Sequence, residues 1–227
     1  MKNCISVLII LFSFTAISSE AQYYRVRPRV QVRVRPQPYG RPVPPQRRAT
    51  EKRPAFQPTI NLSIGYGLPN LDKNQLANFY NSYKGNFSQT GPITGAVDYQ
   101  FSRYMSIGLL GTYGKVSVPY YDYNSDGKTP SFTGSQENWS VMLNLMSYIP
   151  TNTKQVEPYL RTAVGINNWK QTYLDPSGAV AAQPMEPSQL AYQVSLGTRI
   201  NVSKQAGFFV EAGYGKYILN GGLTLKF

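Results

Sequence analysis

The sequence predicts an all-β protein: an eight-stranded antiparallel β-barrel that spans a membrane, preceded by a signal peptide and a disordered basic arm rich in proline and arginine. Three observations within residues 59–227 lead to this fold class. Apolar and polar side chains alternate with a period of two, which gives each strand one apolar and one polar face. Short and long connections alternate between the strands. The final strand ends on an aromatic residue, Phe227.

The composition argues against several classes of protein. Of the 227 residues, 41% are hydrophobic and the mean hydropathy is -0.34, which argues against a helical membrane protein. The only cysteine, Cys4, lies in the leader, so we expect no disulfide and no thiol chemistry in the mature chain. The chain has no histidine, the commonest general base. We therefore expect a protein that is not an enzyme and holds no cofactor.

Residues 1–21 have the features of a secretory signal peptide. Lys2 precedes an apolar run from Ile5 to Ile17, small residues follow, and cleavage is predicted after Ala21. The run is short for a membrane-spanning helix, which needs roughly 20 apolar residues, so a retained anchor is the weaker alternative. We therefore expect the protein to be exported.

Residues 22–58 differ sharply in composition. Nine arginines and Lys52 against Glu51 give this segment a net charge of +9, within +12 for the chain. Proline removes backbone donors and like charges repel, so we expect an extended, disordered arm on the periplasmic side. The arm is either a solvated spacer or an electrostatic tether to a lipid head group or to an anionic envelope polymer such as peptidoglycan. Nucleic acid is not an expected partner of an exported chain. The arginines expected to bind such a polymer are Arg25, Arg27, Arg29, Arg33, Arg35, Arg47 and Arg48.

Eight alternating segments make up the predicted barrel: 59–67, 93–101, 105–114, 138–148, 158–169, 189–202, 208–216 and 217–227. In chain order, their apolar faces are Ile60, Leu62, Ile64 and Tyr66; Val97, Tyr99 and Phe101; Met105, Ile107, Leu109 and Tyr113; Trp139, Val141, Leu143 and Leu145; Leu160, Val164 and Ile166; Leu190, Tyr192, Val194, Leu196 and Ile200; Phe208, Val210, Ala212 and Tyr214; and Leu219, Leu223, Leu225 and Phe227. The other faces are mainly Gly, Ser, Asn and charged residues, which suits a polar lumen. The alternative, a soluble lipocalin-like barrel, would turn the apolar faces inward.

The lengths of the connections predict which end of the barrel faces outward. The links after the second, fourth and sixth strands are short (102–104, 149–157 and 203–207), and those after the first, third and fifth are long (68–92, 115–137 and 170–188). Membrane barrels pair short periplasmic turns with longer external loops. The hairpin around Lys216 and Tyr217 is an exception, because it should be external and yet is tight.

Aromatic residues at the strand ends predict two girdles at the membrane interfaces. The outer girdle comprises Tyr66, Tyr113, Trp139, Trp169, Tyr192 and Tyr214, and the inner girdle comprises Phe101, Tyr148, Tyr159, Phe208 and Phe227. Tyr148, Tyr159 and Trp169 have the parity of the lumen rather than of the lipid face, which weakens their assignment.

Residues 59–227 resemble the small eight-stranded bacterial outer-membrane barrels of the OmpA/OmpX type. The resemblance rests on the leader, the alternation, the asymmetry of the links and the terminal Phe227. It implies a location in the bacterial outer membrane, contact with outer-membrane lipid, and recognition of Phe227 as an assembly signal by the barrel assembly machinery. It implies no particular function, because such barrels include anchors, adhesins, assembly factors and enzymes.

Five charged residues have the parity of the lumen: Asp98, Arg161, Arg199, Glu211 and Lys226. Unpaired charges there would be costly, so we expect ion pairs of Arg199 with Glu211 and of Glu211 with Lys226. Eight strands leave an interior just wide enough for side chains to fill, which predicts a sealed lumen; a narrow gated pore is the alternative.

The first two long links combine tyrosine with Asn or Ser, a composition that binds through flat aromatic area and adaptable polar contacts. These tyrosines are Tyr80, Tyr83, Tyr120, Tyr121 and Tyr123. The second link also contains Asp122, Asn124 and Asp126 before a glycine, which is the first half of a calcium loop. The twelfth position of that loop is Thr133 rather than Glu, so an Asx-rich turn is the stronger reading and calcium the weaker one.

The sequence therefore favours a structural and interaction protein of the outer membrane, with surface-exposed loops and a basic periplasmic arm that tethers it to anionic envelope material. A small channel or transport barrel is one alternative, and an accessory subunit of a larger envelope complex is another.

Overall fold

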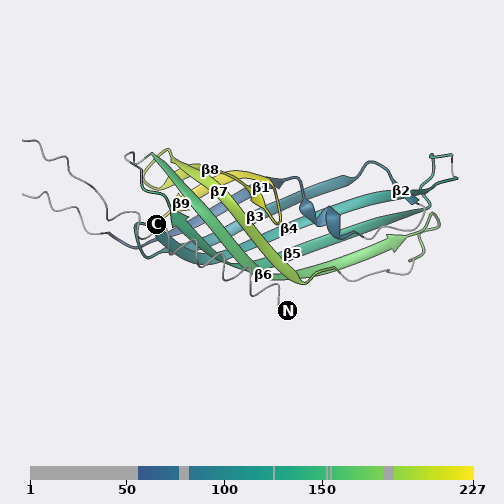
Figure 1. Ribbon diagram of the computed structural model, residues 1–227, viewed down its shortest axis with the longest axis horizontal. Coiled ribbons are helices and arrows are strands. Elements are labelled where there is room, and N and C mark those ends of the chain that lie inside the picture. Colours follow the sequence, from purple (N-terminus) through teal and green to yellow (C-terminus); the bar gives the residue numbers. More distant parts are fainter. Residues whose placement is uncertain (1–55, 77–81, 125, 152, 154, 181–186) are drawn as a thin grey trace, which may run out of the picture. The chain divides into compact units, whose positions relative to one another are not determined.

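The computed structural model describes residues 56–76, 82–124, 126–151, 153, 155–180 and 187–227 (Figure 1). The predicted signal peptide, residues 1–21, lies outside the described residues. The same is true of residues 22–55 of the predicted arm, including every arginine for which polymer binding is predicted.

The described residues form nine strands and one short 3-10 helix. In chain order these are β1 (Thr59–Leu68), η1 (Leu71–Gln75), β2 (Ser82–Lys84), β3 (Ser88–Gln100), β4 (Met105–Asp122), β5 (Phe132–Tyr148), β6 (Val156–Leu174), β7 (Leu190–Asn201), β8 (Ala206–Tyr214) and β9 (Leu219–Lys226). In this part of the chain no helix has the length and apolar character needed to span a membrane.

Eight of these strands close into an antiparallel barrel. They pair in the order β1, β3, β4, β5, β6, β7, β8 and β9, and β9 returns to pair with β1. At this seam the amide of Ile60 donates to the carbonyl of Phe227 at 3.0 Å, and the amide of Phe227 donates back to Ile60 at 2.9 Å. The predicted barrel of eight strands is confirmed, with its last residue beside its first strand. The remaining strand, β2, pairs with the outer end of β4.

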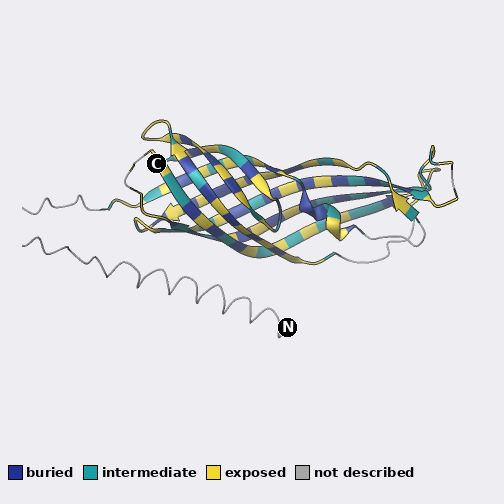
Figure 2. Cartoon of the chain, turned by 45° about the horizontal axis from the view of Figure 1, so that its top comes forward, coloured by how far each residue is buried: buried dark blue, intermediate teal, exposed yellow. Residues whose placement is uncertain are grey.

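Buried and exposed residues alternate along the barrel strands (Figure 2). On β4, Leu109 is 55% exposed while Leu110 is fully buried, and on β5, Leu143 is 55% exposed while Met142 is fully buried. The exterior thus carries a belt of apolar side chains, as on the lipid-facing side of a membrane barrel and rarely on a soluble protein. The apolar faces point outward as predicted, and the lipocalin-like alternative is wrong. Members of the belt include Ile60, Leu62, Ile64, Val97, Leu109, Val141, Leu143, Val164, Leu196, Val210 and Leu223.

The links at the two ends of the barrel differ in kind. At the inner end, residues 101–104, 149–155 and 202–205 connect β3 to β4, β5 to β6, and β7 to β8, so these links are short as predicted. At the outer end, residues 215–218 form the tight hairpin between β8 and β9 that departs from the rule.

Four strands, β3 to β6, run beyond their predicted outer ends. β4, β5 and β6 have 18, 17 and 19 residues, whereas β7, β8, β9 and β1 have 12, 9, 8 and 10. The prediction of an external loop at 115–137 is wrong for most of its length, because β4 and β5 stay paired as far as Tyr120 opposite Phe132. β6 likewise continues to Leu174, and β3 already begins at Ser88.

The physical reason is an inversion of polarity along unbroken strands. Up to Tyr113 the outward side chains of β4 are mainly apolar, whereas beyond it they begin with Lys115 and Ser117. The apolar residues then occupy the inward face, where Val116 and Val118 are buried. Loss of the outward apolar pattern predicts the end of a strand, but here it marks only the end of the membrane belt.

The extended ends of β3 to β6, together with β2, form a curved wall on one side of the barrel (Figure 1). We call it the outer wall: residues 82–90, 115–122, 132–137 and 170–174. Its inner face holds an apolar core that is separate from the lumen and is partly covered by Leu76, directly after η1. The buried residues of this core are Leu76, Val116, Val118, Tyr120 and Tyr173, with Phe132 packed against them.

A charge placed on the belt tests this orientation. We expect Leu143→Arg to lower the free energy of unfolding in lipid vesicles by about 2–4 kcal/mol, because Leu143 faces lipid near the middle of the belt. Ser135→Arg is the matched control: it has the same outward parity on the same strand but lies on the outer wall, so it should cost less than about 1 kcal/mol. Denaturant titration in vesicles measures both values, and equal losses would contradict a belt that ends below the outer wall.

Candidate functional site

A buried guanidinium group links three strands across the lumen. Arg161 projects inward from β6 and is only 2% exposed. Its Nη1 lies 3.1 Å from Oε1 of Glu211 on β8, and its Nη2 lies 3.8 Å from Oδ2 of Asp98 on β3. Both carboxylates are buried as well. One cation therefore holds two anions that come from different parts of the barrel wall.

Neutral donors complete the environment of these carboxylates. The hydroxyl of Tyr159 donates to Oε1 of Glu211 at 2.7 Å, and the hydroxyl of Tyr217 donates to Oε2 at 2.8 Å. The side-chain amide of Asn144 donates to Oδ1 of Asp98. An unpaired charge in this position would cost several kcal/mol, and these donors together with Arg161 offset that cost. We call this network of Arg161, Asp98, Glu211 and their hydrogen-bond donors the plug, because its side chains project from the strands into the lumen.

Arg199 belongs to a second group of charges in the lumen, nearer the inner end. Its Nη1 lies 3.6 Å from Oε2 of Glu157 and 3.5 Å from Oδ1 of Asn61. Its guanidinium carbon lies 5.7 Å from the centroid of the Tyr148 ring, within the range of a cation–π contact.

The ion pairs differ from the predicted ones. Arg199 does not pair with Glu211, and Lys226, half-buried at the rim, has no ion pair within the described part of the chain. The register of β7 with β8 places Phe209 rather than Glu211 opposite Arg199. The prediction joined charges on strands that follow one another in sequence, whereas the narrow lumen lets Arg161 reach Glu211 across β7.

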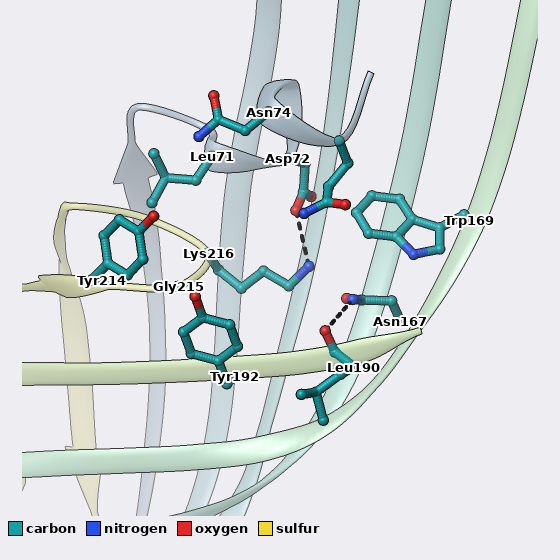
Figure 3. Close-up of a pocket in the computed structure, with 11 residues that line it drawn as sticks. Leu71, Asp72, Asn74, Asn167, Trp169, Leu190, Tyr192, Tyr214, Gly215 and Lys216 are labelled. Carbon is teal, nitrogen blue, oxygen red and sulfur yellow. Dashed lines mark hydrogen bonds and ion pairs between the residues drawn. The ribbon is translucent and has the colours of Figure 1, made fainter. Parts of the chain in front are cut away.

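Residues 69–76, which follow β1 and include η1, lie across the outer mouth of the lumen. Asn70 caps η1 by accepting a hydrogen bond from the amide of Asp72 at 3.0 Å. Oδ1 of Asp72 lies 3.0 Å from Nζ of Lys216, in the tight hairpin between β8 and β9 (Figure 3). Oδ2 of Asp72 accepts from the side-chain amide of Asn138 on β5 at 2.9 Å. Asp72 and Lys216 are both buried, so this ion pair ties the link to opposite sides of the mouth.

Backbone contacts fasten the same link. The amide of Leu71 donates to the carbonyl of Lys216 at 3.2 Å, and the amide of Ile218 donates to the carbonyl of Leu68 at 3.3 Å. The Trp169 ring lies beside the ammonium group, with its centroid 4.9 Å from Nζ of Lys216. The pocket lined in part by Leu71, Trp169 and Lys216 has a volume of about 90 Å³.

Sequence reasoning missed the ion pair of Asp72 with Lys216. Asp72 lies in a segment predicted to be a loop, and Lys216 ends a predicted strand. One signal was present in the sequence: the hairpin at Lys216 is tight, although it lies at the outer end of the barrel, where long links are expected. Such a hairpin places Lys216 at the outer mouth of the lumen, where a buried ammonium group needs a carboxylate partner.

The aromatic girdles contain fewer residues than predicted. Tyr66, Tyr113, Trp139, Tyr192 and Tyr214 are exposed on the outward face, and so are Phe101, Phe208 and Phe227 at the inner end. Tyr148 and Tyr159 are instead buried in the lumen, and Trp169 lines the outer mouth, so their assignment to the girdles is wrong. Their parity decides their positions, because alternate residues of a strand face opposite sides of the sheet.

The predicted loop residues have mixed positions. Tyr120 is buried in the core of the outer wall, whereas Tyr83 and Tyr123 are exposed; Tyr80 lies outside the described residues. Asp122, Asn124 and Asp126 are exposed around the turn between β4 and β5, in which residue 125 is not described. Among the described residues, no group of three or more His, Cys, Asp or Glu side chains could hold a metal ion. Calcium binding at this turn stays a prediction.

Comparison with known proteins adds little to this geometry. No family model and no curated protein matches the sequence. Two similar solved structures are a de novo designed transmembrane β-barrel and Ail, the attachment invasion locus protein of Yersinia pestis, in complex with the heparin analogue sucrose octasulfate. The designed barrel is 14% identical, with 74% of this chain and 95% of that chain covered, at a TM-score of 0.39. Ail is 13% identical, with 75% of this chain and 97% of that chain covered, at a TM-score of 0.37.

The pairing of the strands and the apolar belt decide the architecture, and the two scores do not. The chain is a small eight-stranded transmembrane β-barrel. The predicted resemblance to barrels of the OmpA/OmpX type is thereby confirmed as a resemblance of architecture.

Loss of the guanidinium group tests the plug of this barrel. We expect Arg161→Met to lower the free energy of unfolding by about 3–5 kcal/mol, because Asp98 and Glu211 would stay buried without their cation. Lys115→Met is the control, since it breaks an exposed ion pair with Glu137 of 2.8 Å that should contribute less than about 1 kcal/mol. Denaturant titration in vesicles compares the two. A small loss for both variants would mean that water, rather than Arg161, stabilises the lumen carboxylates.

Proposed function

We propose that this protein is a sealed barrel of the bacterial outer membrane that presents its outer wall to the surroundings and holds anionic envelope material through its basic arm. The observation that carries the proposal is the presence of buried ion pairs at two levels of the lumen, in the Arg161 network and between Asp72 and Lys216. A lumen filled with paired charges gives solutes no path. The surfaces that can act therefore lie outside the barrel.

The outer wall supplies the external surface in this proposal. Near its end the rings of Tyr83 and Tyr121 stack with centroids 5.2 Å apart, and Tyr123 in the adjoining turn is 82% exposed. Aromatic rings among Ser and Asn residues contact partners at a low cost in side-chain entropy. Because β4 and β5 are paired almost to the turn, these rings are held at a fixed position beyond the belt. This arrangement supports an interaction surface.

The position of Phe227 supports the proposed route into the outer membrane. Its side chain is exposed at the end of β9, and its backbone completes the seam with β1. An aromatic residue at this seam is accessible to an assembly machinery until the barrel closes. The proposal includes no catalytic step, in keeping with a sequence that has no histidine.

Electrical recording separates the sealed barrel from the channel alternative. We expect the full-length protein in planar bilayers to give no conductance steps, because the plug and the mouth link occlude the lumen in series. Glu211→Ala should also be silent, since the link held by Asp72 and Lys216 remains. Steady steps from the unmodified protein would refute the sealed barrel and favour a channel.

The basic arm extends the proposal to the periplasmic side. Its arginines lie outside the described residues, so the support comes from the sequence alone: a segment of net charge +9 directly before the first strand. A dense cationic segment attracts an anionic polymer over a distance of about 10 Å at moderate ionic strength.

Sedimentation with purified peptidoglycan tests the arm. We expect the full-length protein to co-sediment, to lose most of this binding when residues 22–58 are deleted, and to release the polymer as salt is raised, because the attraction is electrostatic. A variant that keeps the arm and lacks only the turn 123–131 is the control, and it should bind peptidoglycan normally. Binding that is absent, or that salt does not weaken, would eliminate the tether.

A further inference from the structure

Charged residues occur at one place on the outward side of the strands. In the described strands, the charged side chains with outward parity are Lys115 on β4, Glu137 on β5 and Lys170 on β6. The register aligns them in a single row, with Lys115 opposite Glu137 and Glu137 opposite Lys170. We call these three residues the cationic row. Its isolation on an otherwise uncharged surface calls for a specific explanation.

The cationic row lies at the outer edge of the belt. Two residues closer to the inner end, on the same faces of β4 and β5, are Tyr113 and Trp139 of the outer girdle. Two residues of a tilted strand correspond to a rise of roughly 5 Å along the barrel axis. The row therefore stands just above the aromatic residues that mark the interface, at the level of lipid headgroups. The long side chains of lysine extend readily toward this polar layer.

The charges within the row do not balance. Nζ of Lys115 lies 2.8 Å from Oε1 of Glu137. This hydrogen bond lowers the pKa of Glu137 and raises the pKa of Lys115, so both groups are charged at neutral pH. Lys170 is exposed and its charge also lowers the pKa of Glu137, but within the described part of the chain it has no carboxylate oxygen within 4.0 Å. Two cations thus accompany one anion, which leaves the row with one net positive charge for an external anion.

The surface below the row is suited to acyl chains. Val141 and Ile166 lie on the outward faces of β5 and β6 toward the membrane centre, and both are exposed. A lipid whose headgroup contacts the row can therefore pack its chains on the belt. A free phosphate would gain only the contact with the lysines.

We propose that Lys115 and Lys170 form a binding site for the phosphate of an anionic lipid in the outer leaflet, with Glu137 between them limiting the net charge. The ligand class is a lipid that carries a negatively charged phosphate headgroup. This inference rests on the membrane orientation of the barrel that the proposed function also uses, and it is independent of the arm and of the closure of the lumen.

Trp139 is a natural reporter of this site. It is 53% exposed, two residues from Glu137, whereas the chain's other tryptophan, Trp169, lines the outer mouth. In full-length Trp169→Phe protein, fluorescence therefore reports on lipid beside the row alone. The protein is reconstituted into phosphatidylcholine vesicles that contain either brominated phosphatidylglycerol or brominated phosphatidylcholine at equal mole fraction, because bromine quenches tryptophan on contact.

We expect brominated phosphatidylglycerol to quench Trp139 more strongly, with a preference of about fivefold for each lysine that contributes. Lys115→Gln and Lys170→Gln should each reduce this preference, the double variant should abolish it, and Glu137→Gln should increase it. Lys128→Gln is the matched control: it removes the same charge in the exposed turn beyond the outer wall and should leave the preference unchanged.

Three outcomes would overturn the site. Equal quenching by the two lipids in the Trp169→Phe protein would mean that no anionic lipid is enriched beside the row. An equal loss of preference in Lys128→Gln and Lys170→Gln would assign the effect to the net charge of the chain. Deletion of residues 22–58 separates the arm: a preference that persists supports the row, whereas one that disappears places it in the arm.

Discussion

Closure of the sheet between β9 and β1 is the constraint on which the rest of this structure depends. In hydrocarbon an unpaired backbone amide or carbonyl costs several kcal/mol, so strands can cross only as a closed ring. The reciprocal hydrogen bonds between Ile60 and Phe227 complete that ring. Once it is complete, alternate residues of each strand meet lipid or lumen and must satisfy opposite requirements. The apolar belt and the polar interior are two results of the same closure.

The interior is so narrow that its polar side chains must satisfy one another. Arg161 and Tyr159 on β6 contact Glu211 on β8 across the intervening strand β7. The residue of β7 at this position must therefore have a small side chain. Gly197 on β7 provides the space: a Cβ there would lie 2.7 Å from Cγ of Glu211 and 2.8 Å from Cζ of Tyr159. Larger barrels fill such space with water. Here the side chains of Arg161, Glu211 and Tyr159 occupy it, as the small number of strands leads one to expect.

Sequence reasoning predicted the eight-stranded barrel, but not the outer ends of its strands or the ion pairs in its lumen. Alternation is a local property, so the number of strands and the direction of their apolar faces could be predicted. The outer halves of β4 and β5 could not, because polarity reports the solvent that a strand meets rather than its backbone conformation; Val116 and Val118 continue the strand with reversed faces. Contacts across the lumen, such as that of Arg161 with Glu211, depend on the stagger of the closed sheet. The ion pair of Asp72 with Lys216 needs the fold of a link that has no periodic pattern of its own.

The continuity of β4 and β5 also determines how the molecule responds to mechanical force. The two strands are paired without interruption from Met105 opposite Ser147 to Tyr120 opposite Phe132. This pairing has no break. A force applied outside the membrane and directed along the strands therefore acts on all the hydrogen bonds between β4 and β5 together, in shear, and does not break them one after another. A load on the outer wall is thus transmitted through these hydrogen bonds directly to the embedded part of the sheet.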